Sequence, residues 1–135
     1  MDTPSPSMRE LAQRLLALEA ATQSGSDPHV HEGVRVCDKL RISLTRFAGA
    51  DGFTVLLGRA LVLARADVPS LKTVKITADG RLEGFEGFVA EAGNVAIEAA
   101  TAITAHLLGL LDTFIGEPLT LRLVREAWPE ASLAE

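Results

Sequence analysis

The chain has 135 residues, 47% of them hydrophobic, with five Phe, one Trp and no Tyr; this is enough for one domain with a core of aliphatic side chains. The formal net charge of −5 at pH 7 argues against a general phosphate-binding surface, because nucleic-acid affinity depends on clustered Lys and Arg. One cysteine excludes an intramolecular disulfide, and no signal peptide with a basic start and an apolar run is evident, so we expect a soluble cytoplasmic protein.

The N-terminal third predicts two helices joined by a flexible connection. Residues 1–6 are rich in Pro and Ser and should form a flexible tail. Ser7 and Glu10 then have the spacing of a capping box, and the helix that they start should end near Gln23, with one apolar side formed by Met8, Leu11, Leu15 and Leu18. After the connection SGSDPH, a second helix is expected over about 33–48, where the same spacing recurs at Cys37, Leu40, Leu44 and Phe47.

A third helix and a β-hairpin should follow. The sequence AGADG ends the second helix, and Asp51 is suited to cap a third helix that ends near Ala66 and is apolar almost all round. Apolar and polar residues then alternate within 72–85, which is typical of strands. The dipeptide Asp79-Gly80 indicates a two-residue hairpin turn in this segment.

The C-terminal part predicts a long central helix and a short final one. Helix four is expected over about 87–115, with two adjacent apolar stripes that need partners on two or three sides. The longest apolar run in this helix, AATAITAHLLGLL, has 13 residues and is too short to span a bilayer. Gly116 should end the helix, and Pro118 should lie in the first turn of a fifth helix that runs to Pro129.

Together these elements predict a mainly α fold. About five helices should pack around the long central helix (about 87–115), with one short antiparallel β-hairpin (about 72–85). We expect residues 7–130 to form a single helical domain between the tail at 1–6 and a loose C-terminus at 131–135.

The stretch HVHEGVRVC, residues 29–37, is the first candidate for chemistry. A metal site needs three or four converging ligands, and His29, His31 and Cys37 could supply them, with Glu32 as a further ligand. However, the segment follows SGSDP, which indicates mobility, and Cys37 shares the apolar side of the second helix, where free cysteine behaves as a small hydrophobe. The sequence therefore favours a loop and a buried thiol, without a metal or other cofactor, and keeps a metal or haem sensor as an alternative.

A Cys–His enzyme is the sharpest catalytic hypothesis. His106 could approach Cys37 if helices two and four pack together, but a buried thiol is inert, and nothing supplies an orienting third group or an oxyanion hole. Solvated faces explain the pairs of carboxylates, Glu83 with Glu86 and Glu91 with Glu98. The glycines match neither a dinucleotide fingerprint nor a phosphate loop. The sequence therefore favours a non-enzymatic protein.

The order helix, tight turn, helix and hairpin over residues 33–86 resembles the layout of a small winged-helix transcription regulator. The second helix of such a unit enters the major groove of DNA. Here that helix has few polar side chains, namely Thr54, Arg59 and Arg65, and the tip TADGR has one Arg, with Lys72 and Lys75 nearby. Because the net charge also has the wrong sign, DNA binding is the alternative rather than the main hypothesis.

Surplus apolar surface is the remaining feature. Helices three and four have more hydrophobic circumference than a small bundle usually needs to bury, and a large core or a symmetric dimer would cover it. We expect a regulatory or protein–protein interaction module that forms a homodimer or binds a partner protein, with no membrane partner. Large apolar side chains provide most of the binding energy at such interfaces, and those expected near this surface are Leu108, Leu111, Ile115 and Trp128.

Overall fold

The computed structural model describes residues 6–21, 32–78, 80, 82–92 and 95–128. Within these residues the chain is mainly helical, with five α-helices and a two-stranded antiparallel sheet, which confirms the predicted fold class. The helices are α1 (Pro6–Ala21), α2 (Glu32–Asp67), α3 (Phe85–Ala92), α4 (Val95–Ile115) and α5 (Glu117–Ala127). A 3₁₀-helix, η1 (Pro69–Thr73), precedes the strands β1 (Lys75–Ile76) and β2 (Leu82–Glu83).

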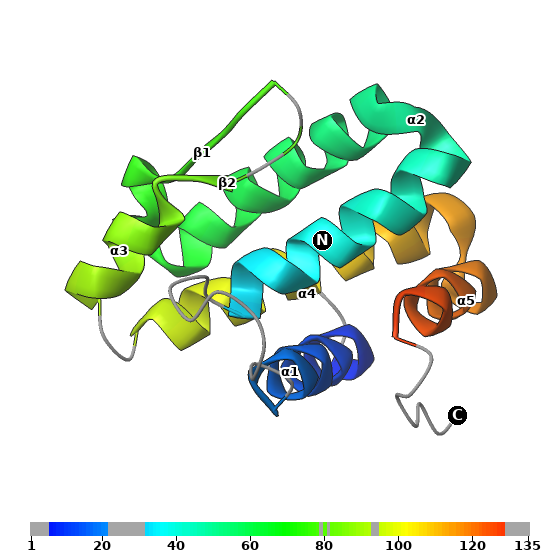
Figure 1. Ribbon diagram of the computed structural model, residues 1–135, viewed down its shortest axis with the longest axis horizontal. Coiled ribbons are helices and arrows are strands. Elements are labelled where there is room, and N and C mark those ends of the chain that lie inside the picture. Colours follow the sequence, from blue (N-terminus) through cyan, green and yellow to red (C-terminus); the bar gives the residue numbers. More distant parts are fainter. Residues whose placement is uncertain (1–5, 22–31, 79, 81, 93–94, 129–135) are drawn as a thin grey trace.

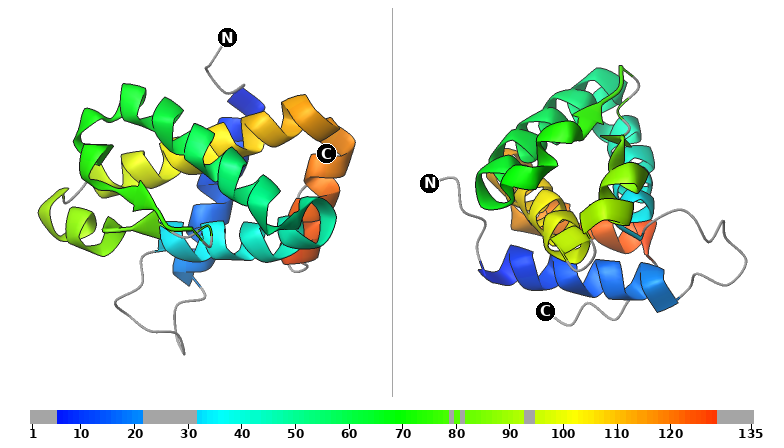
Figure 2. Two further views of the ribbon diagram at one scale, coloured as in Figure 1. Left: turned by 90° about the horizontal axis from the view of Figure 1, so that it is seen from above. Right: turned by 90° about the vertical axis from the view of Figure 1, so that its left-hand side faces the viewer.

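Helix α4 is the centre of the fold (Figure 1). All of its residues from Thr101 to Leu108 are buried, and it packs against the four other α-helices. In the right-hand view of Figure 2, α1 lies on one side of α4 and the later part of α2 lies on the opposite side. This arrangement covers the middle of the wide apolar face that the sequence predicts for the helix, while Ile97 and Phe114 near its ends remain exposed.

By length and composition, α4 is also the one helix in the described part of the chain that could cross a membrane. The helix has 21 residues, so it extends beyond the 13-residue apolar run. However, 67% of its most apolar window is buried inside this chain, and core helices of soluble proteins have the same property.

A sharp bend divides α2 into two arms. Gly49 has φ 86° and ψ 160°, a non-helical conformation between the first arm, residues 32–48, and the second arm, residues 50–67. The two arms point in different directions (Figure 1). They correspond to the second and third helices predicted from the sequence, and the break lies in the predicted AGADG segment because only glycine readily adopts these angles.

Two boundaries differ from the sequence prediction. The expected helix at 87–115 is two helices, α3 and α4, and residues 93–94 between them lie outside the described part; Gly93 and Asn94 both have low helix propensity. The predicted two-residue hairpin turn is wrong, because Ile76 pairs with Leu82 and five residues separate the strands. The turn closes one residue earlier, where the Gly80 N–H donates to the Thr77 carbonyl oxygen at 3.0 Å.

The end of α4 and the starts of α1 and α5 lie at or within one residue of the predicted positions. Gly116, with φ 87°, separates α4 from α5, and Pro118 lies in the first turn of α5. Helix α1 begins at Pro6, the last residue of the predicted tail. The rest of that tail, residues 1–5, and the predicted C-terminus at 131–135 lie outside the described residues.

The core is mainly aliphatic, as the composition predicts, and contains a few large aromatic side chains. Trp128, Phe53 and Phe85 are among its largest fully buried side chains. Trp128 follows the last turn of α5, and the Lys39 ammonium of α2 lies 5.5 Å from the centroid of its ring, within the range of a cation–π contact. The end of α5 is thereby held against the first arm of α2.

Candidate functional site

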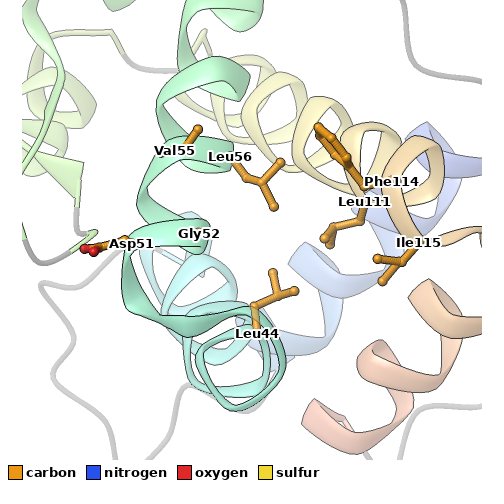
Figure 3. A pocket seen from close by; sticks show the side chains of 8 residues that line it. All are labelled: Leu44, Asp51, Gly52, Val55, Leu56, Leu111, Phe114 and Ile115. Carbon is orange, nitrogen blue, oxygen red and sulfur yellow. The ribbon is translucent and has the colours of Figure 1, made fainter.

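An open apolar hollow lies between the bend of α2 and the C-terminal end of α4 (Figure 3). Its volume is about 530 Å³, which is in the usual range for binding sites in proteins. We call it the α2–α4 groove. The residues that line it come from both arms of α2 and from the last turns of α4: Leu44, Asp51, Gly52, Val55, Leu56, Leu111, Phe114 and Ile115.

The groove exists because two helices separate at this end of the molecule. The second arm of α2 starts after Gly49, and α4 ends at Ile115. Leu44 of the first arm is 1% exposed and lies beneath the space between these two ends (Figure 3). Large apolar side chains remain in solvent at the rim, because Val55 is 71% exposed and Phe114 is 70% exposed.

The interior of the groove has almost no means of holding a polar ligand. Among the described residues that line it, Asp51 alone has an ionisable side chain, and its carboxylate points away from the hollow (Figure 3). Leu44, Leu56 and Leu111 provide only aliphatic groups around the space. Small-molecule sites generally add a few precisely placed polar groups that fix the orientation of the ligand. The lining therefore suits apolar side chains from a protein surface better than a sugar, nucleotide or metabolite.

The structure places only part of the predicted interface at this groove. Leu111 and Ile115 line it. Leu108 and Trp128 are 0% exposed and contribute to the core of the chain, so the expectation that they lie near the surface needs correction. Both side chains are large and apolar, and these properties suit a protein core as well as an interface.

Phe114 is the residue that the sequence did not single out as an interface residue. It belongs to the same stripe of α4 as the buried Ala96 and Ile103. The stripe alone does not reveal its exposure, because Ile103 is 1% exposed whereas Phe114, further along the same stripe, is 70% exposed. A weak signal was present, since Gly116 marks the end of α4 two residues later.

The candidate metal site does not gain support. His29 and His31 lie outside the described residues. Within the described part of the chain, no group of three or more His, Cys, Asp or Glu side chains is placed to hold a metal ion. Cys37 is 5% exposed, and burial, with a smaller contribution from the Asp38 carboxylate, raises the pKa of its thiol to about 12.

His106 has a different partner from the one considered in the catalytic hypothesis. Its Nε2 lies 2.9 Å from Oδ2 of Asp67 at the end of α2, and the imidazole is 4% exposed whereas the Asp67 side chain is 50% exposed. A buried histidine held by a carboxylate on a neighbouring helix joins the two helices. Together with the protonated, buried Cys37, this arrangement does not favour a Cys–His nucleophile.

The residues considered for DNA binding lie on the second arm of α2 and around the hairpin. The Arg65 Nη2 atom donates to the Val74 carbonyl oxygen at 2.6 Å, which ties the second arm of α2 to the segment before β1. The outer face of this arm exposes Val55 and Val62 beside Arg59. Gly80 in the hairpin turn is buried against α2. An exposed apolar face and a packed turn are not features that favour contact with phosphates.

No protein-family model, no curated protein and no solved structure matches this chain.

Proposed function

We propose that the chain is a non-enzymatic regulatory or interaction module that self-associates, and that the α2–α4 groove is its contact surface. One observation carries the proposal: a large aromatic side chain, Phe114, stands in solvent at the rim of an apolar hollow. Exposed apolar patches next to a hollow are typical of protein–protein contact sites.

A second copy of the chain is the occupant that suits this surface. The projecting group and the receiving hollow lie side by side, so a two-fold axis close to Phe114 would place each Phe114 in the groove of the other copy. An isologous contact of this kind needs self-complementarity within one patch. The absence of polar side chains from the interior fits such an occupant, because a Phe ring requires no hydrogen-bond partner.

The apolar surface continues beyond the groove. Val62 is 54% exposed and lies seven residues after Val55, on the same face of the second arm. Burial of a Phe side chain contributes about 1.5–3 kcal/mol. A two-fold dimer would bury two Phe114 side chains, one from each copy. The valines extend the contact area towards that of a stable interface, about 800 Å² per partner.

The test compares two exposed apolar positions on α4. Phe114 lies at the groove, whereas Ile97, which is 47% exposed, lies near the other end of the helix. We expect the wild type to dimerise in a light-scattering dilution series on a size-exclusion column. Phe114→Ala should raise the dimer dissociation constant by tenfold or more, because it removes a central aromatic anchor, while Ile97→Ala should leave it within about twofold.

Two results would overturn the proposal. One is a wild-type chain that stays monomeric at every concentration tested. The other is an equal effect of both substitutions, which would place the contact elsewhere. Since Phe114 is 70% exposed, Phe114→Ala should keep the fold, and the fluorescence of Trp128, the only Trp in a chain without Tyr, will verify this.

A further inference from the structure

The turn of the β-hairpin packs against both arms of α2. Gly80 is buried, and a methyl group added to it would lie 3.0 Å from Oγ1 of Thr54 and 3.2 Å from Cδ2 of Phe53, both on the second arm. The same methyl group would lie 3.6 Å from Cδ of Arg41, on the first arm. Gly80 therefore lies in the space where the arms diverge. On the side of the second arm, this space is too narrow for a residue larger than glycine to fit at ordinary van der Waals distances.

The space beside the bend is open on the side where a side chain would project. A methyl group at Gly49 would meet no heavy atom of the described residues within 4 Å. The conformation with φ 86° and ψ 160° belongs to a region that glycine reaches more freely than other residues. The angle between the arms therefore depends on what the arms pack against, and this includes α4 as well as the hairpin turn, which lies against both arms.

We infer that the Gly80 turn acts as a spacer that sets the bend of α2 and, through the bend, the width of the α2–α4 groove. The groove takes Leu44 from the first arm and Val55 and Leu56 from the second. A change in the angle at Gly49 moves these side chains relative to one another. The hairpin thereby controls a surface that it does not line, and displacement of its turn would alter the groove.

The effect on self-association rests on the proposed function, but the effect on the bend does not. The two are therefore measured separately. Spin labels on Ile42→Cys and Ala66→Cys report the distance between the arms, since both residues are exposed, neither lines the groove and neither belongs to the proposed contact surface. Cys37 should escape labelling because it is buried and its thiol pKa is about 12. Dilution with unlabelled protein removes distances between copies.

The hairpin offers a matched pair of glycines for this experiment. Gly80 and Gly84 have φ values of 80° and 85°, so Gly80→Ala and Gly84→Ala introduce similar backbone strain. A methyl group at Gly84 would approach the Thr73 carbonyl oxygen at 3.3 Å, in η1 rather than in α2. Arg41→Ala is a third variant without backbone strain, which removes the contact between the turn and the first arm.

We expect Gly80→Ala to shift the distance distribution between the labels and Arg41→Ala to broaden it, while Gly84→Ala leaves it as in the wild type. Wild-type distances in both Gly80→Ala and Arg41→Ala would overturn the inference. Altered distances in a chain that never dimerises would support the spacer and refute the proposed function. Altered distances with an unchanged dimer dissociation constant would refute the control of self-association by the turn.

Discussion

Cys37 shows how burial changes the chemistry of a single residue. The thiol is buried in the apolar side of α2 and its pKa is raised from 9.0 to about 12. Because the thiolate is the reactive form, at pH 8 it should be roughly a thousandfold rarer in the folded chain than in the unfolded chain. We expect iodoacetamide to modify Cys37 at pH 8 only in denaturant. Rapid modification of the folded protein, followed by mass spectrometry, would contradict this placement.

Asp67 tests the contribution of the buried histidine. Asp67→Ala removes the partner of His106 Nε2 and leaves a buried polar nitrogen unpaired, since the ring is 4% exposed. We expect the free energy of unfolding to fall by about 1–3 kcal/mol, and Asp67→Asn, which keeps an acceptor oxygen, should cost less. Urea unfolding followed by Trp128 fluorescence measures the change.

The control for Asp67 is a carboxylate in a weaker pair. Asp38 lies 3.8 Å from Nε of Arg41 in a partly exposed i,i+3 arrangement, where ion pairs contribute about 0–1 kcal/mol. Asp38→Ala should therefore change stability less than Asp67→Ala does. Equal losses for the two variants would show that the His106–Asp67 contact has no special structural role.

At the scale of the element, the bend in α2 depends on one glycine. Gly49→Ala places a Cβ on a backbone with φ 86° and ψ 160°, and we expect a loss of about 1–3 kcal/mol from backbone strain alone. Gly58 is the matched control in the same helix: it is helical, and a methyl group there also meets no heavy atom within 4 Å. Gly58→Ala should stabilise the chain by about 0.5–1 kcal/mol. Urea midpoints that move in the same direction for both variants would contradict this.

The helices were predictable from the sequence because their signals are local. The three-four spacing of Leu11 and Leu15 in α1 and the Gly116–Pro118 end signal of α4 depend only on neighbouring residues. The hairpin register was not predictable in the same way. Gly80 packs against Thr54 and Phe53, which are far away in sequence. This tertiary contact accompanies a turn in which the Gly80 N–H bonds to the Thr77 carbonyl oxygen, whereas local propensity favours a two-residue turn centred on Asp79-Gly80.

The candidate site was harder to predict because exposure is a property of the whole fold. Leu108 and Phe114 are both large and apolar and lie on the same helix, yet one is 0% and the other 70% exposed. The two residues are six positions apart and so lie on different sides of α4, and only Phe114 stands at the rim of the α2–α4 groove. Periodicity identifies which residues are apolar, whereas the direction of a distant helix determines which of them remain in solvent.

At the scale of the whole molecule, net charge gives the proposed dimer a characteristic salt dependence. Each copy carries a formal charge of −5, so two copies with centres roughly 30 Å apart repel each other at low ionic strength. The screening length falls from about 30 Å at 0.01 M salt to about 8 Å at 0.15 M. We therefore expect the dimer dissociation constant to fall by several-fold, up to about tenfold, over this range. Sedimentation equilibrium at the two salt concentrations measures the change.

The sign of this effect separates the two main hypotheses. An apolar contact between like-charged copies strengthens as salt is added, whereas binding to duplex DNA weakens because it depends on the release of counterions from phosphates. The same protein can be titrated with a duplex of arbitrary sequence at both salt concentrations. Stronger self-association at 0.15 M salt without duplex binding is expected from the exposed Phe114 and the apolar groove. Duplex binding that is lost as salt increases would instead favour the winged-helix alternative, with the Arg59 face of α2 directed towards the nucleic acid.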